Sequence, residues 1–183
     1  VYSVDDLADL KGRKFQKKRN HVNRFRAEHS QFELQNLTGG NFSAAQHMVG
    51  EWYRARMQAD PTGDYMMESI AMSRAFRHYE GLQMESAVLV ENGEILAVTM
   101  GSRLWSDTFD IHFEKAREDV DGAYAAVNCE FARYLRLKYP NLRYLNREDD
   151  VGLAGLRKAK LSYNPHHMVE KSWAYLAEDF HGD

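Results

Sequence analysis

The sequence contains one cysteine, three prolines and no long apolar run. Because Cys129 has no partner in the chain, no internal disulfide can form, which suits a reducing compartment. No apolar stretch approaches the roughly 18 residues that a membrane-spanning helix needs, and the amino terminus lacks the apolar core of a signal peptide. We therefore expect a cytoplasmic protein that is not an integral membrane protein.

Several catalytic and nucleotide-binding motifs are also missing. The sequence has no Walker phosphate loop, no Gly-x-Gly-x-x-Gly fingerprint and no Gly-x-Ser-x-Gly nucleophile elbow. Adjacent histidines such as His166 and His167 seldom share a metal ion, and no other spacing resembles a zinc site, so we predict no metal. Cys129 lies beside the apolar stripe of a long helix and is predicted to be a packed core side chain rather than a nucleophile.

The length and composition are those of one domain. With 183 residues and 44% hydrophobic content, the chain can bury a substantial core without disulfides or a structural metal. It begins at Val1 rather than at methionine, so it is compatible with an excerpt from a longer protein that carries a partner domain.

Positive charge is concentrated near the amino terminus. Eight Lys and Arg residues lie from Lys11 to Arg26, and no acidic residue interrupts the chain between Lys11 and Glu28, although the net charge of the chain is −3. A basic patch on an acidic protein favours a specific anionic partner, such as RNA or an anionic lipid surface. The alternative is a solvated helix face, and the sequence leaves both interpretations open.

Helical periodicity dominates the first eighty residues. A polar, glycine-containing stretch at 38–41 is predicted to break the chain. The predicted helices are 4–11, a basic amphipathic helix around Phe15, Val22 and Phe25, a helix from Ser43 that ends before Asp60, and 65–79.

A β hairpin and a third strand follow. The apolar runs 87–90 and 95–100 are joined by a segment with Asn-Gly, the strongest short hairpin signal. In a strand over 108–114, alternation places Phe109, Ile111 and Phe113 on one face and Asp110, His112 and Glu114 on the other. The remaining predicted elements are a helix at 122–139 closed by Pro140, a strand at 142–145, a helix at 151–160 and a strand at 168–176. This order predicts an α/β or α+β fold with a mixed central sheet flanked by helices.

Two clusters in the sequence have the residue types of a reactive site. His112, Glu114 and Lys115 could form an acid–base relay at the third strand, although a solvent-facing strand reads the same way. The segment 146–150 follows a strand and precedes a helix, where sheet proteins often bind ligands. Helix capping explains Asp149 and Asp150, and it leaves Arg147 and Glu148 as the stronger functional candidates.

A third cluster lies at the end of the next predicted helix, where Arg157, Lys158 and Lys160 are followed by Tyr163. Cations at a helix carboxyl end complement the helix dipole, which explains Arg157 and Lys158 without a ligand.

Four sequence blocks together resemble the bacterial phosphatidylglycerol lysyltransferase C-terminal-domain-like family, many of whose members have no assigned reaction. The blocks are KFQKKRNHVNRF at 14–25, HFEKA at 112–116, NREDDVGL at 146–153 and LRKAKLSYNP at 156–165. The resemblance implies a single GNAT-like acyltransferase domain over 1–183, with the basic helical segment 1–40 packed on it. It also implies that the chain is the second of two such domains in tandem.

Relatives in this family transfer an aminoacyl group from charged tRNA to a lipid hydroxyl, which implies roles for the candidate residues. His112 or Glu114 would be the base, and Lys115 would help to hold the oxyanion. Arg147, Lys158 and Lys160 would bind phosphate, and Glu148 with Asp150 would receive a cationic aminoacyl side chain. The remaining substrate-binding candidates are Asn146 and Tyr163 at the site and, for tRNA or an anionic headgroup, Lys17, Lys18, Arg19 and Asn20.

The donor predicted from the resemblance is aminoacyl-tRNA rather than acetyl-CoA. Acetyl-CoA users of this fold have a glycine-rich loop that cradles pyrophosphate, whereas the corresponding segment 117–123 has one glycine and three acids. Two alternatives stay open, a coenzyme A-dependent N-acetyltransferase and a non-catalytic module that binds RNA or anionic lipid.

Overall fold

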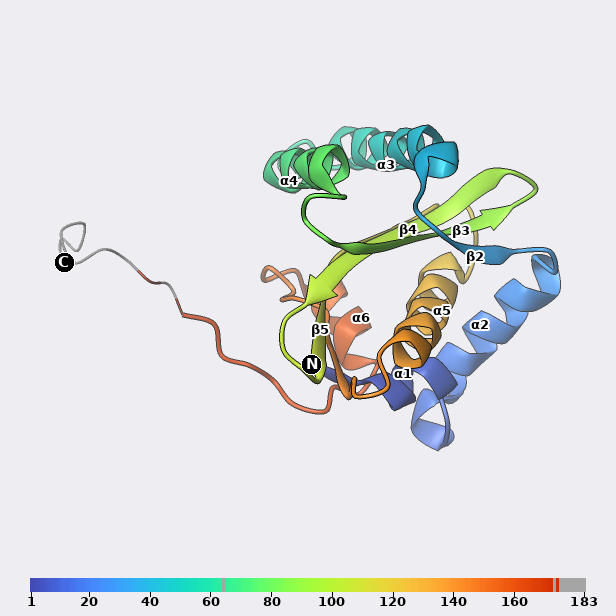
Figure 1. Cartoon of the computed structure of the whole chain (residues 1–183), viewed down its shortest axis with the longest axis vertical. Helices are drawn as coiled ribbons and strands as arrows, with labels where there is room; N and C mark the ends of the chain where they lie inside the picture. Colours follow the sequence, from blue (N-terminus) through green and yellow to red (C-terminus); the bar gives the residue numbers. More distant parts are fainter. Residues whose placement is uncertain (64, 173, 175–183) are drawn as a thin grey trace.

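The computed structural model describes residues 1–63, 65–172 and 174. Its centre is a six-stranded mixed sheet with the order β1-β6-β5-β4-β3-β2 (Figure 1). The strands are β1 (Tyr2–Ser3), β2 (Glu33–Asn36), β3 (Glu85–Glu91), β4 (Glu94–Arg103), β5 (Thr108–Ala116) and β6 (Tyr144–Asn146). The helices are α1 (Val4–Asp9), α2 (Gln16–Glu28), α3 (Gly39–Ala59), α4 (Met66–His78), α5 (Ala123–Lys138) and α6 (Ala154–Leu161), with a 3₁₀ turn at Arg13–Phe15.

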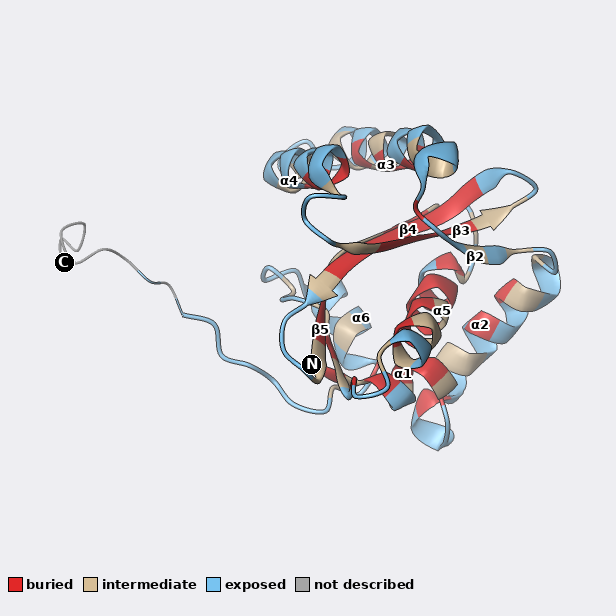
Figure 2. Cartoon of the chain, viewed as in Figure 1, coloured by how far each residue is buried: buried red, intermediate tan, exposed pale blue. Residues whose placement is uncertain are grey.

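Helices cover both faces of the sheet. Figure 1 shows α3 and α4 on one face and α1, α2, α5 and α6 on the other. Figure 2 shows buried residues along the central strands and along the sheet-facing sides of α3 and α5. Met48 and Phe76 pack on Val98 on the first face, while Val127 packs with Leu89 on the second. The mixed sheet flanked by helices confirms the predicted fold class.

The hairpin between β3 and β4 forms where it was predicted. Its turn residues Asn92 and Gly93 have φ angles of 52° and 83°. Two successive positive φ angles match the twist of the adjoining strands, and Asn-Gly adopts them at low cost. The predicted pairing of 87–90 with 95–100 is confirmed.

Strands β5 and β6 pair in parallel over only three residues, and beyond them the hydrogen-bond ladder between the two strands has a gap. The pairs run from Thr108 with Tyr144 to Asp110 with Asn146. Beyond them β6 ends, whereas β5 continues to Ala116. Helix α5 is the crossover that parallel pairing requires. The backbone pairing therefore stops at the carboxyl ends of the two strands, which leaves a gap in the ladder between β5 and the β6–α6 loop.

The predicted alternation along β5 is wrong beyond Ile111, because the strand contains a β bulge. The register shifts between Met100 and Gly101 of β4, which makes His112 an extra residue in β5. Ile111 consequently packs on the side of α1 and α5, whereas Phe113 packs on the side of α3 and α4. A bulge exchanges the faces of all later residues in a strand.

Other segment predictions need correction. The glycine pair at 39–40 lies inside α3, because the backbone N–H of Thr38 donates to Asn41 Oδ1 at 2.8 Å and caps the helix start. Strands β1 and β2 were not predicted, and β2 places a strand within the segment 1–40 that was expected to be helical. Residues 168–172 form no strand, and positions 173, 175 and 176 of that predicted strand lie outside the described residues.

Within the part of the chain that the structure describes, no helix combines the length and apolar character needed to cross a membrane. Cys129 is buried in α5 and its thiol donates to the carbonyl of Ala8, as expected for a core side chain.

Candidate functional site

A row of polar residues crosses three strands where the gap begins. Ser102 of β4 pairs with Asp110 of β5, which in turn pairs with Asn146 of β6. His112 lies two residues beyond Asp110 at the bulge, and Glu148 lies two residues beyond Asn146 in the loop before α6. Three separate segments therefore contribute polar side chains to one end of the gap.

Asp110, His112 and Glu148 form the centre of this group. Their ligand atoms all lie within 4.8 Å of one another, so this triplet has the chemistry and spacing that could hold a metal ion, although the sequence predicted none. His112 Nδ1 lies 3.6 Å from Asp110 Oδ2, and its Nε2 lies 2.8 Å from Ser102 Oγ. A cationic group already contacts the site, because the ammonium of Lys171 donates to Glu148 Oε2 at 2.5 Å.

Burial and the neighbouring carboxylate set the protonation of this group. Burial and the charge of Glu148 raise the pKa of Asp110 to about 7. Burial lowers the pKa of His112, against the opposing effect of Glu148. An imidazole with a lowered pKa is neutral at physiological pH and can accept a proton.

On the other face of the sheet, Arg147 and Glu114 form a buried ion pair. Arg147 Nη2 donates to Glu114 Oε1 at 2.7 Å, and the two side chains are 14% and 9% exposed. Asn128 of α5 donates to the second carboxylate oxygen of Glu114 at 3.2 Å. The guanidinium also lies 4.9 Å from the ring centroid of Tyr163. This pair ties β5 to the loop that follows β6.

The predicted relay of His112, Glu114 and Lys115 does not assemble, because Lys115 faces away from Glu114. Its ammonium donates to both oxygens of Glu68 in α4 at 2.9 Å and lies 4.0 Å from the ring centroid of Trp52. Glu114 instead contacts α5 and the β6–α6 loop. The physical reason is strand geometry, since adjacent residues of a strand point to opposite faces.

Lys160 holds the loop that carries Arg147 and Glu148. Its ammonium donates to the backbone carbonyls of Arg147, Glu148 and Asp149, with the Glu148 contact at 3.1 Å. Glu148 itself has a positive φ of 56°, which is uncommon for a residue other than glycine. The contacts from Lys160 therefore help to fix an unusual loop conformation beside the gap.

The other predicted binding residues lie in α2, in the β6–α6 loop and in α6. Lys18 lies 4.1 Å from the ring centroid of Tyr163, next to the Arg147 pair. Arg19 donates to the carbonyl of Gly12 at 3.1 Å, and Asp150 accepts from Arg157 Nε at 2.6 Å. The residues whose side chains remain exposed to solvent are Lys17, Asn20 and Lys158.

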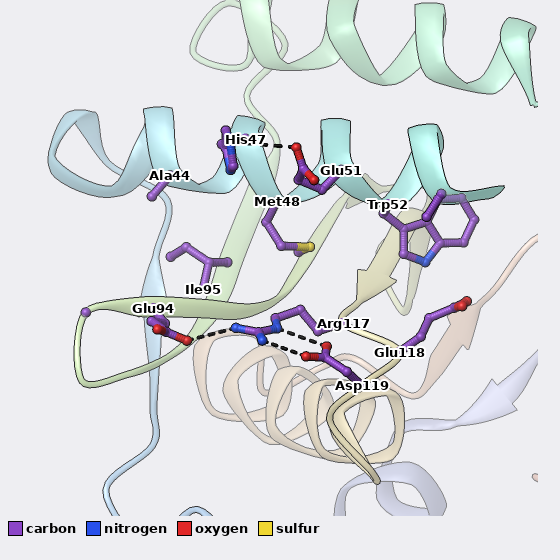
Figure 3. Close-up of a pocket in the computed structure, with 12 residues that line it drawn as sticks. Ala44, His47, Met48, Glu51, Trp52, Glu94, Ile95, Arg117, Glu118 and Asp119 are labelled. Atoms are coloured by element: carbon purple, nitrogen blue, oxygen red, sulfur yellow. Dashed lines mark hydrogen bonds and ion pairs between the residues drawn. The ribbon is translucent and has the colours of Figure 1, made fainter. Parts of the chain in front are cut away.

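A hollow lies between α3, the start of β4 and the loop after β5 (Figure 3). Its volume is about 580 Å³, and it is lined by Met48, Trp52 and Ile95 on its apolar side. Arg117 borders it and donates to Glu94 at 2.8 Å and to Asp119 at 2.7 Å. The guanidinium is therefore already neutralised by two carboxylates.

The acids of the segment 117–123 are in ion pairs, and α2 packs against the end of the segment. The acids that were expected to repel pyrophosphate each have an arginine partner, with Arg56 on Glu118 and Arg24 on Asp121. A Cβ on Gly122 would lie 2.8 Å from the carbonyl oxygen of His21, so α2 packs closely on the start of α5. The backbone at Gly122 is therefore in close contact with α2, whereas residues 117–119 border the hollow.

Sequence reasoning missed Ser102 and gave Asp110 no separate role. Ser102 lies in a strand without a motif around it, and no signal in the sequence could have found it. The alternation Asp110-x-His112 was visible, but its partner Glu148 lies 36 positions further along the chain. Only the parallel pairing of β5 with β6 brings them together.

Comparisons with known proteins show what this fold and sequence are similar to. A crystal structure of a conserved protein of unknown function from Bacteroides thetaiotaomicron is 40% identical with a TM-score of 0.83, over 91% of this chain and 55% of that one. The C-terminal domain of a candidate lysylphosphatidylglycerol synthetase from Agrobacterium fabrum is 15% identical with a TM-score of 0.57, over 90% and 54% of the chains. A candidate acetyltransferase from Clostridium difficile is 10% identical with a TM-score of 0.58, over 80% and 98% of the chains.

The similarities to the Agrobacterium and Clostridium structures show that the fold is the GNAT fold of acetyltransferases. The chain spans about half the length of the Bacteroides chain and of the Agrobacterium domain, 55% and 54%. The family model for phosphatidylglycerol lysyltransferase, C-terminal, matches residues 1–175. The chain therefore belongs to the phosphatidylglycerol lysyltransferase C-terminal family.

Proposed function

We propose that this chain is an acyltransferase that moves an aminoacyl group from aminoacyl-tRNA to a hydroxyl or amine acceptor. Family and fold support an acyltransferase-like function. The observation that carries the proposal is the gap between β5 and β6, with Asp110, His112 and Glu148 at its edge. In open sheets, ligands bind at the carboxyl ends of strands where neighbouring strands part.

In this proposal His112 is the general base. It is neutral at physiological pH, half-buried, and held by Ser102 and Asp110. A hydroxyl or ammonium acceptor must lose a proton as it attacks the ester carbonyl, and a positioned base typically contributes about 10² to 10⁴ in rate.

The carboxylates of Asp110 and Glu148 would receive a cationic group of the substrate. The contact of Lys171 with Glu148 supports this role, because a primary ammonium fits at that carboxylate. Two carboxylates side by side favour a cation energetically, since it relieves the repulsion that raises the pKa of Asp110. An aminoacyl ester always carries such an ammonium.

Exposed cations on α2 and α6 would contact the phosphates of tRNA. Lys17 and Lys158 are exposed, and Lys18 lies next to the Arg147 pair. Several other basic residues of the amino-terminal cluster have acidic partners, for example Lys14 with Asp6 and Arg26 with Glu130. Phosphate binding would therefore depend on the few cations that stay accessible.

The proposal is tested by measuring the affinity of the chain for charged tRNA, uncharged tRNA and acetyl-CoA over a range of salt concentrations. We expect preference for charged tRNA, with affinity that falls as salt rises. Lys17→Ala and Lys158→Ala should each reduce the salt slope by about one if each contacts one phosphate. Arg74→Ala is the matched control, since it removes an exposed charge from α4, on the face of the sheet opposite α2 and α6 (Figure 1).

Other outcomes would select the alternatives. Binding of acetyl-CoA alone would support a coenzyme A-dependent N-acetyltransferase, which the three acids and single glycine of the segment 117–123 disfavour. Binding of both tRNA forms equally, without transfer of the aminoacyl group to any acceptor, would support an RNA-binding module. His112→Gln should abolish transfer while donor affinity is retained, and unchanged transfer would remove His112 from the proposal.

A further inference from the structure

Ser102, His112 and Asp110 have the arrangement of an activated serine. Ser102 Oγ lies 2.8 Å from His112 Nε2, within hydrogen-bond distance. On the other side of the ring, Nδ1 lies 3.6 Å from Asp110 Oδ2. A nucleophile bonded to a base, with the base oriented by a third group, is the general signature of covalent catalysis.

The surroundings favour the tautomer that this chemistry needs. Asp110 is buried and its Oδ2 lies beside His112 Nδ1, and a Glu148 carboxylate oxygen lies within 4.8 Å of a ring nitrogen. Acceptors at Nδ1 favour a proton on that nitrogen, which leaves the lone pair of Nε2 to accept the hydrogen of the Ser102 hydroxyl. The Nδ1 contact is longer than a hydrogen bond, and such contacts often shorten only when substrate is bound.

The bulge explains why the histidine can reach the serine. Ile111 pairs with Gly101, and Phe113 pairs with Met100. His112 is inserted between these two paired residues and has no partner of its own in β4. The extra residue of a bulge stands outside the ladder and is free to aim its side chain at a neighbour. Bulges beside reactive centres commonly serve this purpose.

We propose that Ser102 is a nucleophile that accepts an acyl group from an ester donor, with His112 as its base and Asp110 as a positioning residue. Ser102 Oγ attacks the ester carbonyl carbon, and its proton moves to His112 Nε2. The bond between the carbonyl carbon and the leaving oxygen then breaks, and the leaving alkoxide takes that proton from His112 and departs as an alcohol.

The second half of the reaction regenerates the free hydroxyl of Ser102. An amine or hydroxyl acceptor attacks the acyl-serine and gives its proton to His112, and Ser102 recovers that proton as its bond to the acyl group breaks. With water as acceptor the products are the carboxylic acid and free enzyme, so weak esterase activity is expected. The natural donor rests on the proposed function, whereas the reactivity of Ser102 does not.

The test is labelling with an alkyl fluorophosphonate, which phosphonylates activated serines and needs neither tRNA nor an acceptor. We expect one adduct per chain by intact mass, located at Ser102 by peptide mapping, and no adduct in Ser102→Ala. His112→Gln should slow labelling by about 10² or more. Ser106→Ala, which changes an exposed serine in the β4–β5 loop, should label like the unaltered protein.

Asp110 is tested by rescue. Asp110→Asn should slow labelling, and Asp110→Glu, which keeps the carboxylate, should restore part of the rate when both variants unfold at the same temperature. Equal rates in the two variants would remove Asp110 from the arrangement.

Absence of an adduct at Ser102 in the folded protein, or equal labelling of Ser102→Ala, overturns the proposal. The outcomes also separate it from the transferase assignment. Labelling of Ser102 without aminoacyl transfer would support Ser102 as a nucleophile and contradict the proposed transferase function. Aminoacyl transfer that persists in Ser102→Ala would show that the acceptor attacks the donor ester directly. This result would contradict Ser102 as a nucleophile and support the transferase function.

Discussion

Arg147 donates to Glu114 at 2.7 Å across the two strands that part, and both side chains are almost fully withdrawn from solvent. The pair joins the carboxyl-terminal part of β5 to the first residue after β6, beyond the last backbone pair of these two strands. The ion pair therefore links the two strands where no backbone hydrogen bonds join them.

Breaking this pair should destabilise the protein strongly. Arg147→Met leaves the Glu114 carboxylate buried without its partner, which typically costs about 3–5 kcal/mol. Urea unfolding of Arg147→Met, Glu114→Gln and the double variant measures the coupling. We expect the loss of unfolding free energy in the double variant to be smaller than the sum of the losses in the two single variants. Strict additivity would show that the two side chains do not stabilise each other.

Gly101 should not tolerate a side chain. A Cβ at this position would lie 2.2 Å from the carbonyl oxygen of Asp110 and 2.5 Å from the ring of Phe109. Gly101→Ala should therefore lower the unfolding free energy by about 1–3 kcal/mol or more, because a packed core does not yield easily. Gly155→Ala in α6 is the control, since a Cβ there meets nothing within 4 Å. Equal stability of the two variants would contradict the close approach of β4 and β5.

Asp9 should contribute to stability at neutral pH and lose that contribution in acid. Hydrogen bonds from Arg136 and Lys11 lower its pKa from 3.8 to about 2. Because the folded state holds the carboxylate more acidic than the unfolded state does, the stabilisation is complete above 3.8 and disappears as the pH falls through about 2.

The measurement is urea unfolding of the unaltered protein and of Asp9→Asn at several pH values. The stability difference between them should shrink as the pH falls across this window. In an Arg136→Met background most of the pH dependence of that difference should vanish. A difference that stays constant with pH would contradict the ion pair.

Lys115 should act mainly in docking α3 and α4 on the sheet. Its ammonium contacts Glu68 and Trp52, and burial lowers its pKa. Lys115→Met preserves the apolar stem and should lower stability only modestly, because Glu68 is partly exposed and can be hydrated. Once aminoacyl transfer is measurable, the transfer rate should be retained in the folded variant. A lost rate with unchanged stability would restore the predicted oxyanion role.

Local sequence patterns predicted most of the elements near the site. The Asn-Gly turn fixed the β3–β4 hairpin, and Pro140 marked the end of α5. Strands β1 and β2 were missed because they are short edge strands, whose pairing depends on the neighbouring strand rather than on their own pattern. The bulge at His112 was missed because period-two alternation assumes an uninterrupted ladder.

The sequence by itself determined the helix periods, the hairpin, the buried apolar stripe of α5 and the resemblance to one family, because each of these depends on local spacing or on residue identity. Tertiary structure alone decided which polar residues meet. Ser102, Asp110, His112 and Glu148 come together because a bulge turns one side chain and a parallel pairing of three residues joins two distant segments. Contacts of this kind depend on strand register across the sheet, which no local pattern specifies.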